Sequence, residues 1–210
     1  MAPPDLTAPY AAAAAHGISV YRLDPAASRV LILVGKAGPL AGAGHVHVIV
    51  VRNLHGFALA ASRGGGRADL FFPVRSLAVD PPAALSALGG EYAKAGMSAE
   101  DRAGTREHML GASVLNAPHY PWTALTVFAS AAVADKPRAP TVNIRLRGVT
   151  RSIHTPGRYR ITPESIRAAG AFTLRQTDFG IKPYSVLFGV LRVKDALRIR
   201  YHLVFHRWRP

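Results

Sequence analysis

Residues 196 to 205, ALRIRYHLVF, decide the fold, because apolar and polar side chains alternate through most of the stretch. The apolar side chains occupy every second position, at Leu197, Ile199, Tyr201, Leu203 and Phe205. Between them lie Arg198, Arg200 and His202. Because successive side chains of a strand point to opposite faces, this period of two predicts a strand with one apolar face and one solvated face.

Short apolar runs follow one another from Ile18 onward, separated by Gly, Pro, Asp and Asn. They include SRVLILVGK, GHVHVIVVR, ADLFFPVRSLAV, ALTVFASAAVA, TVNIRLRGV and AAGAFTLRQ. Runs of this length between turn residues are typical of strands. Since they do not alternate with helices, they predict an all-β fold, a single antiparallel β-barrel of about eight strands.

One segment departs from the strand pattern. Residues 97 to 112, MSAEDRAGTREHMLGA, begin with Ser98 and Asp101 at the spacing of a capping box and continue with good helix formers. This segment predicts one short helix inserted between the strands. Residues 1 to 17 are rich in Pro and Ala without periodicity and predict a mobile N-terminal arm, which leaves residues 18 to 207 as one domain.

The composition limits the chemistry of the chain. Of its 210 residues 49% are hydrophobic and none is cysteine, which excludes disulfides and thiolate metal or redox centres. No run reaches the roughly 18 apolar residues of a membrane helix, and the N-terminus lacks the basic start of a signal peptide. The sequence therefore leaves the localisation unknown: either the chain stays in the cytoplasm, or an export signal has been removed or lies upstream.

The stretch FTLRQTDFGIKPY, residues 172 to 184, contains Asp178, Phe179 and Gly180, the triplet that holds magnesium in protein kinases. The Gly-rich phosphate loop and the catalytic loop of a kinase are absent from the sequence, as are the common hydrolase and metalloprotease motifs. We therefore expect no enzymatic activity. The triplet therefore needs an explanation other than magnesium binding.

Four segments, in this order, resemble the YceI family of lipocalin-like, polyisoprenoid-binding proteins: YRLDPAASRV, REHMLGASVLNAPHYPWTAL, NIRLRGVTRSI and GAFTLRQTDFGI. The similarity runs from about Tyr21 to Phe205, and the sequence departs from the family pattern at residues 44 to 47, GHVH, and in its basic tail. The resemblance implies a lipocalin-like barrel whose apolar interior binds or transports a polyisoprenoid lipid or isoprenoid quinone. It also implies a bacterial and often periplasmic protein that needs no other cofactor. In such a barrel the triplet Asp178, Phe179 and Gly180 is expected to be a structural turn, in which Phe179 is buried, Gly180 relaxes the backbone and Asp178 caps a nearby donor.

The resemblance and the strand pattern together suggest which residues contact such a lipid. Strand aromatics can line a tunnel for the isoprenoid tail, and a few polar side chains can contact the head group. The predicted ligand-binding residues are His45, His47, Phe57, Phe72, Phe128, Phe172, Arg175, Phe179, Tyr184, Phe188, Tyr201 and Phe205. For an anionic head such as a pyrophosphate, Arg175, Lys182 and Arg106 are candidates, because Arg donates paired hydrogen bonds to phosphate; surface charges or salt bridges explain them equally.

The spacing of His45 and His47 also suggests an alternative function, metal binding. Two positions apart on a predicted strand, both side chains point to the same face, a spacing that can bind one metal ion. A third ligand, such as His108 or His119, would have to come from another segment. The alternative is therefore a metal-binding or redox-associated barrel protein, whereas the other interpretation of the pair is barrel histidines or contacts to a ligand head group.

The net charge of +14 is concentrated in the last third of the chain. Residues 146 to 210 hold 13 Lys and Arg against 3 Asp and Glu, whereas residues 1 to 145 hold 13 against 9. Such a surface suits nucleic acid or an anionic membrane, although arginines on the solvated faces of strands also explain it. Since no nucleic-acid motif is present, we expect an apolar lipid ligand, transient contact with an anionic membrane surface and no nucleic-acid partner. The sequence leaves a homodimer open.

Overall fold

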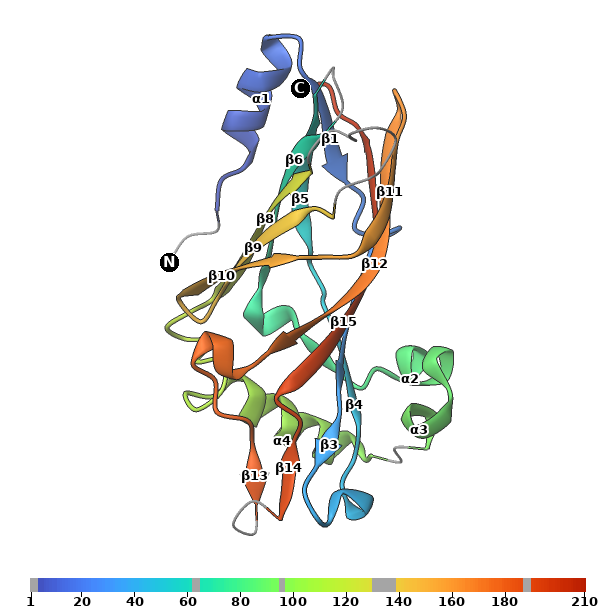
Figure 1. Cartoon of the computed structure of the whole chain (residues 1–210), viewed down its shortest axis with the longest axis vertical. Helices are drawn as coiled ribbons and strands as arrows, with labels where there is room; N and C mark the ends of the chain where they lie inside the picture. Colours follow the sequence, from blue (N-terminus) through green and yellow to red (C-terminus); the bar gives the residue numbers. More distant parts are fainter. Residues whose placement is uncertain (1–3, 62–64, 95–96, 130–138, 187–189) are drawn as a thin grey trace.

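The computed structural model describes residues 4–61, 65–94, 97–129, 139–186 and 190–210. Within them, twelve strands form one large antiparallel sheet and three short strands form a second sheet (Figure 1). The strands of the large sheet are β1 (Ser19–Leu23), β2 (Arg29–Val34), β4 (His47–Val50), β5 (His55–Ala60), β6 (Gly66–Pro73), β7 (Ala78–Val79), β8 (Trp122–Ala129), β9 (Thr141–Leu146), β10 (Val149–His154), β11 (Gly157–Ile161), β12 (Ser165–Arg175) and β15 (Ala196–Arg207). Those of the small sheet are β3 (Lys36–Ala37), β13 (Ser185–Val186) and β14 (Leu191–Val193).

Strand β15 is the centre of the large sheet. One of its edges pairs with β12 over residues 196 to 206. The other edge pairs first with β2, over residues 198 to 202, and then with β1, over residues 205 to 207. The alternating stretch that predicts a strand thus forms one, and it joins three other strands.

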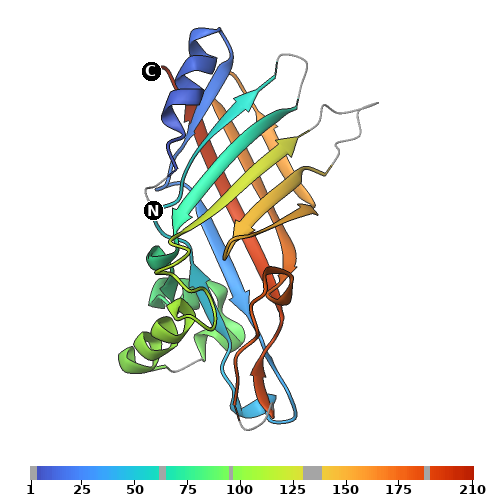
Figure 2. The same cartoon turned by 90° about the vertical axis from the view of Figure 1, so that its left-hand side faces the viewer.

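The large sheet curves strongly, as Figure 2 shows, and apolar side chains fill much of the space that it surrounds. Its order is β10-β9-β8-β6-β5-β1-β15-β2-β4-β7, with β12 and then β11 attached to the second edge of β15. The antiparallel, all-β prediction is confirmed. A closed barrel of about eight strands is not: the described strands number more, and the pairings between them do not join β10 to β11. A side-chain hydrogen bond links the two ends of the sheet instead. Arg147, in the turn between β9 and β10, donates from Nη1 to the carbonyl of Gly180, in the turn that follows β12 (2.9 Å).

The predicted inserted helix is present as α4 (Ala99–Leu110), and it begins with a complete capping box between Ser98 and Asp101. This box lowers the pKa of the Asp101 carboxyl through hydrogen bonds from Ser98. The prediction of a single helix is wrong, because α1 (Thr7–Ala15), α2 (Pro82–Leu88) and α3 (Gly90–Ala93) are also helical. Three short 3₁₀ turns complete the described structure, η1 (Ala41–Ala43), η2 (Val74–Ser76) and η3 (Thr177–Phe179). Among the described residues, no helix is long and apolar enough to cross a membrane.

Helix α1 lies against the outer face of the sheet, where the sequence predicts a mobile arm. Its Tyr10 is buried and stacks on Phe57 of β5, which in turn packs edge-on against Trp208. The Tyr10 hydroxyl donates to the buried carboxylate of Asp69 (2.8 Å), a contact that, with burial as the larger cause, raises the pKa of the tyrosine. Alanine alone gives no amphipathic pattern, so the sequence does not show that one tyrosine anchors this helix.

We expect Tyr10→Phe to lower the free energy of unfolding by about 1–2 kcal/mol, because it removes a buried hydrogen bond to a charged acceptor. Urea denaturation followed by circular dichroism measures the change. Tyr92→Phe, at a half-buried tyrosine of α3, is the matched control and should change the stability by less than about 0.5 kcal/mol. An equal loss in both variants would show that the contact to Asp69 does not hold α1.

Candidate ligand cavity

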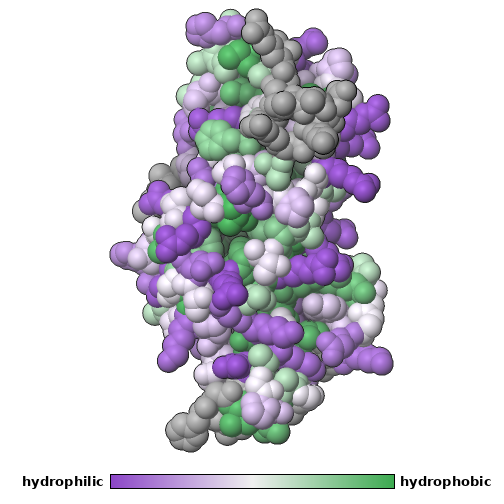
Figure 3. Space-filling model, in the orientation of Figure 1, coloured by the Kyte–Doolittle hydropathy of each residue, from purple (hydrophilic) through white to green (hydrophobic). Residues whose placement is uncertain are grey.

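The concave side of the sheet encloses two apolar cavities, of about 410 Å³ and 170 Å³. They are adjacent, because they share five lining residues: Val30, Phe72, Leu125, Phe172 and Ile199. Figure 3 shows apolar residues exposed between hydrophilic ones near the middle of one face. Cavities of this size and lining are typical of sites for small apolar ligands.

The inward positions of β15 provide one wall of both cavities. Leu197 lines the larger cavity, Tyr201, Leu203 and Phe205 line the smaller one, and Ile199 lines both. The period of two in the sequence therefore corresponds to a lipid-like interior on one side of the strand.

A histidine held by a buried carboxylate is the main polar feature of the larger cavity. His47 Nδ1 lies 2.7 Å from Asp80 Oδ2, and the backbone N–H of Val48 donates to Asp80 Oδ1 (2.7 Å). Asp80 is fully buried, in the left-handed backbone region (φ 45°) directly after β7. Because a carboxylate accepts hydrogen bonds, Nδ1 carries a hydrogen, and Nε2 is the ring nitrogen left for a ligand.

Other polar groups line the same cavity. Thr123 is 4% exposed, and its Oγ1 has no hydrogen-bond partner among the residues that the structure describes. A buried hydroxyl without a partner is costly, so it is a natural contact for a polar ligand atom. At the rim, the ring of His108 on α4 packs edge-on against the ring of Tyr184, with 4.2 Å between centroids. None of the described residues that line this cavity is Lys or Arg, whereas Arg67 and Arg158 are among those that line the smaller cavity.

The half-buried Tyr201 lines the smaller cavity. Burial raises the pKa of the Tyr201 hydroxyl, which also forms a hydrogen bond with the side chain of Thr155. Gly170 lies beside this hydroxyl, and a Cβ there would lie only 2.7 Å from its oxygen, so glycine is required for the ring to fit. The rim of this cavity includes Tyr159 and Ile161 of β11.

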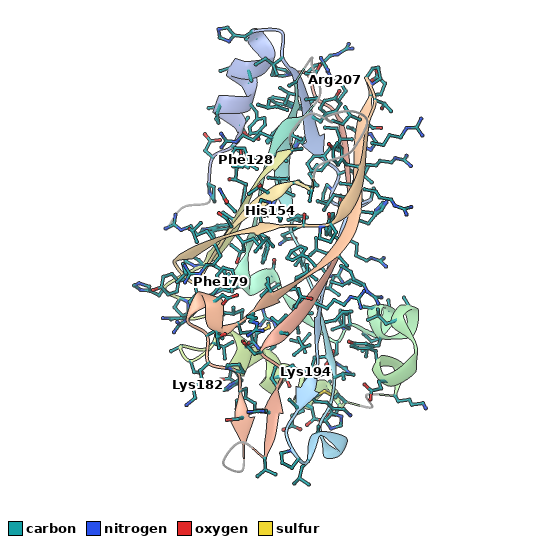
Figure 4. The ribbon with its side chains drawn as sticks, viewed as in Figure 1. Phe128, His154, Phe179, Lys182, Lys194 and Arg207 are labelled. Atoms are coloured by element: carbon teal, nitrogen blue, oxygen red, sulfur yellow. The ribbon has the colours of Figure 1, made fainter. Side chains whose placement is uncertain are left out.

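The structure brings together some of the predicted tail-binding aromatics and separates others. Phe72, Phe172, Tyr184, Tyr201 and Phe205 line the cavities. Phe57 instead lies under α1, and Phe128, near the end of β8 in Figure 4, is 44% exposed beneath the guanidinium of Arg67. Phe188 lies outside the described residues.

Phe179 packs in the core of the η3 turn rather than lining either cavity. It is 1% exposed, and Gly180 after it adopts a left-handed conformation (φ 69°), as the turn interpretation predicts. The cap is different from the prediction, because the carboxylate of Asp195, not that of Asp178, accepts from the Thr177 N–H (2.9 Å).

His45 and His47 occupy different environments, contrary to the shared strand face that the sequence predicts. Strand β4 begins at His47, whereas His45 is exposed in the preceding loop and is not among the residues lining either cavity. Among the described residues, no group of three or more His, Cys, Asp and Glu side chains is close enough to hold a metal ion. The structure thus offers the metal alternative no ligand set around these histidines.

The basic residues predicted for an anionic head do not line the cavities. Arg175 and Lys182 are exposed, and Figure 4 shows Lys182 near the start of β13. Arg106 donates to the carbonyls of Leu77 (3.3 Å) and Arg75 (2.5 Å) and so joins α4 to the η2 turn. The residues that the sequence analysis missed are Asp80 and Thr123. For Asp80, an acid between an apolar strand and Pro81-Pro82 was the available signal.

The model of the YceI-like domain matches residues 21–205. Among solved structures, BcnA of Burkholderia cenocepacia is 16% identical, covers 87% of this chain and 98% of its own, and superposes with a TM-score of 0.60. A polyisoprenoid binding domain from Saccharophagus degradans, implicated in plant cell wall breakdown, is 13% identical, covers 90% and 98%, and gives 0.58. The Campylobacter jejuni YceI protein is 10% identical, covers 77% and 85%, and gives 0.52. No curated protein sequence matches the chain.

We expect Asp80→Asn to lower the free energy of unfolding by about 2 kcal/mol, because an amide cannot accept from both His47 and the Val48 N–H as the carboxylate does. Nitrogen-15 NMR of the imidazole should show a fixed Nδ1–H tautomer in the unaltered protein and a mixture in the variant. Glu91→Gln, at an exposed salt bridge to Lys36 (3.7 Å), is the control and should change little. An unchanged tautomer in Asp80→Asn would show that Asp80 does not fix the tautomer of His47.

Proposed function

The chain belongs to the YceI-like domain family, and from this premise we propose that it binds or transports a neutral isoprenoid lipid, such as an isoprenoid quinone, without catalysing a reaction on it. The observation that carries the proposal is the pair of joined apolar cavities, with a polar site at the wall of the larger one. In this proposal the curved sheet and the η3 turn act as the wall of a lipocalin-like barrel.

The tail of the ligand occupies both cavities. An isoprenoid chain is long, narrow and apolar, and the two cavities adjoin at Phe72 and Phe172, which line both of them. Burial of apolar surface contributes about 25 cal/mol for each Å² removed from water, so the tail supplies most of the affinity. The polyisoprenoid binding domain of Saccharophagus degradans, whose fold is similar, is named for a ligand of this class.

The head of the ligand is uncharged and contacts His47. An anionic pyrophosphate would lose its hydration in the larger cavity without meeting a Lys or Arg, which is unfavourable. A hydroxyl head can instead donate to His47 Nε2, which accepts because Nδ1 carries the hydrogen, and a carbonyl head can accept from the Thr123 hydroxyl. The exposed positions of Arg175 and Lys182 also favour a neutral head over an anionic one.

Native mass spectrometry of protein purified from a bacterial host, followed by organic extraction, tests the proposal directly. We expect about one apolar lipid with a neutral head for each chain. A phosphorylated lipid, or a protein that neither retains nor takes up an isoprenoid quinone, would overturn it.

Leu174→Trp should abolish lipid retention, because a tryptophan at this cavity position fills the space of the tail. Thr173→Trp is the matched control, since the neighbouring residue on β12 is exposed on the opposite face and its variant should retain the lipid. Both variants are checked for native circular dichroism before extraction. Equal retention by the two folded variants would show that the lipid binds elsewhere.

His47→Ala should weaken binding of a short-chain isoprenoid alcohol about tenfold, because the hydrogen bond from the alcohol hydroxyl to His47 Nε2 is lost while the apolar walls stay. Titration calorimetry measures the dissociation constant. His45→Ala, at the exposed histidine two residues away, should leave the constant unchanged. The same loss in both variants would remove His47 from the head-group site.

A further inference from the structure

The solvated face of β11, β12, β15 and β2 carries a dense group of cations, here called the basic face. Its members are Arg29, Arg158, Arg160, Arg167, Arg198, Arg200 and His202, all of them exposed. The register of the strands places them in rows across the sheet, with small residues of β12 between them. Arg158, Ala169, His202 and Arg29 form one such row.

The cations of the basic face have no acidic partners. The salt bridges among the described residues are Lys36–Glu91, His47–Asp80, Arg67–Asp69 and His206–Asp24, so none of them involves the basic face. Arg160 and Arg167 even lie directly opposite each other on β11 and β12. Like charges in cross-strand positions are destabilising, which indicates that this face is suited to an external anion.

The rest of the outer surface of the sheet is covered differently. Helix α1 covers Phe57, and α2 contacts β4. Helices α2 and α3 lie beside the lower end of the basic face in Figure 1, where Tyr92 of α3 interacts electrostatically with Arg198 and Arg200. Among the described residues, the part of the basic face on β11 and β12 carries no helix, and hydrophilic side chains gather along this edge in Figure 3. A flat anionic surface can therefore approach this part of the basic face.

We propose that the basic face docks the protein on an anionic phospholipid bilayer. The choice of a bilayer over nucleic acid rests on the proposed function, because β11 belongs to both features. Its Arg158 and Arg160 are part of the basic face, and Arg158 is also, with Tyr159 and Ile161, among the residues that line the smaller cavity. Docking thus brings a cavity rim next to the membrane in which an isoprenoid lipid resides.

The electrostatics of docking predict its strength and its salt dependence. Each Lys or Arg close to an anionic membrane contributes about 1 kcal/mol, so the loss of three should weaken binding about a hundredfold. Screening limits the attraction to about 10 Å at 0.1 M salt, so binding should fall steeply as salt is added.

Co-sedimentation of the full chain with vesicles tests the proposal. The vesicles contain phosphatidylglycerol and phosphatidylcholine in equal amounts, and phosphatidylcholine alone serves as the neutral reference. The test variant combines Arg160→Ser, Arg167→Ser and Arg198→Ser. The control combines Arg52→Ser, Arg75→Ser and Arg145→Ser, which removes the same charge from exposed residues outside the basic face.

We expect salt-dependent binding to the anionic vesicles only, a loss of about a hundredfold in the test variant and a loss of less than about fivefold in the control. Equal losses in the two variants would overturn the proposal, since net charge alone would then explain binding. The proposal would also be overturned if duplex DNA bound through the same arginines while the vesicles did not bind. Lipid retention, measured separately by native mass spectrometry, shows whether the proposed function survives a failure of docking.

Discussion

The alternation of side chains along β15 is the constraint on which the rest of the structure depends. This strand pairs with β12 on one edge and with β2 and β1 on the other. It therefore joins the pair β11 and β12 to the rest of the large sheet. Its inward residues form a wall of both cavities, and its outward Arg198, Arg200 and His202 belong to the basic face. A shift of the register by one residue would exchange the two faces, so one strand fixes the interior and the charged exterior together.

The interior is built to remain apolar while containing a few placed polar groups. Asp80 is buried, but its oxygens accept from His47 and from the Val48 N–H, which satisfies the carboxylate without a lysine or arginine. Thr123 is the exception, with an unpartnered hydroxyl in the larger cavity. The side chains around the cavity of about 410 Å³ lack van der Waals contacts on their inner side. An apolar ligand that binds there would supply these contacts and so stabilise the fold.

The exterior shows why an aromatic residue in a strand need not belong to the binding site. Phe57 and Phe72 lie on neighbouring strands, yet Phe57 packs under α1 while Phe72 lines both cavities. Because α1 buries part of the outer face, the strands beneath it are apolar on both sides. The part of the basic face on β11 and β12 has no such cover among the described residues, so its arginines remain exposed.

By itself, the sequence determined the all-β antiparallel fold, the helix at Ala99–Leu110 and the buried Phe179 turn, because each depends on periods, caps and turn residues within a few positions. It also located the departure at residues 44 to 47. Only the tertiary structure decided that His47 and not His45 meets the cavity, and that Asp80, 33 positions later, holds its ring. It likewise placed α1 on the sheet through Tyr10 and Asp69, and left the larger cavity without a cation. These contacts join segments far apart in the chain, and no local pattern encodes such distances.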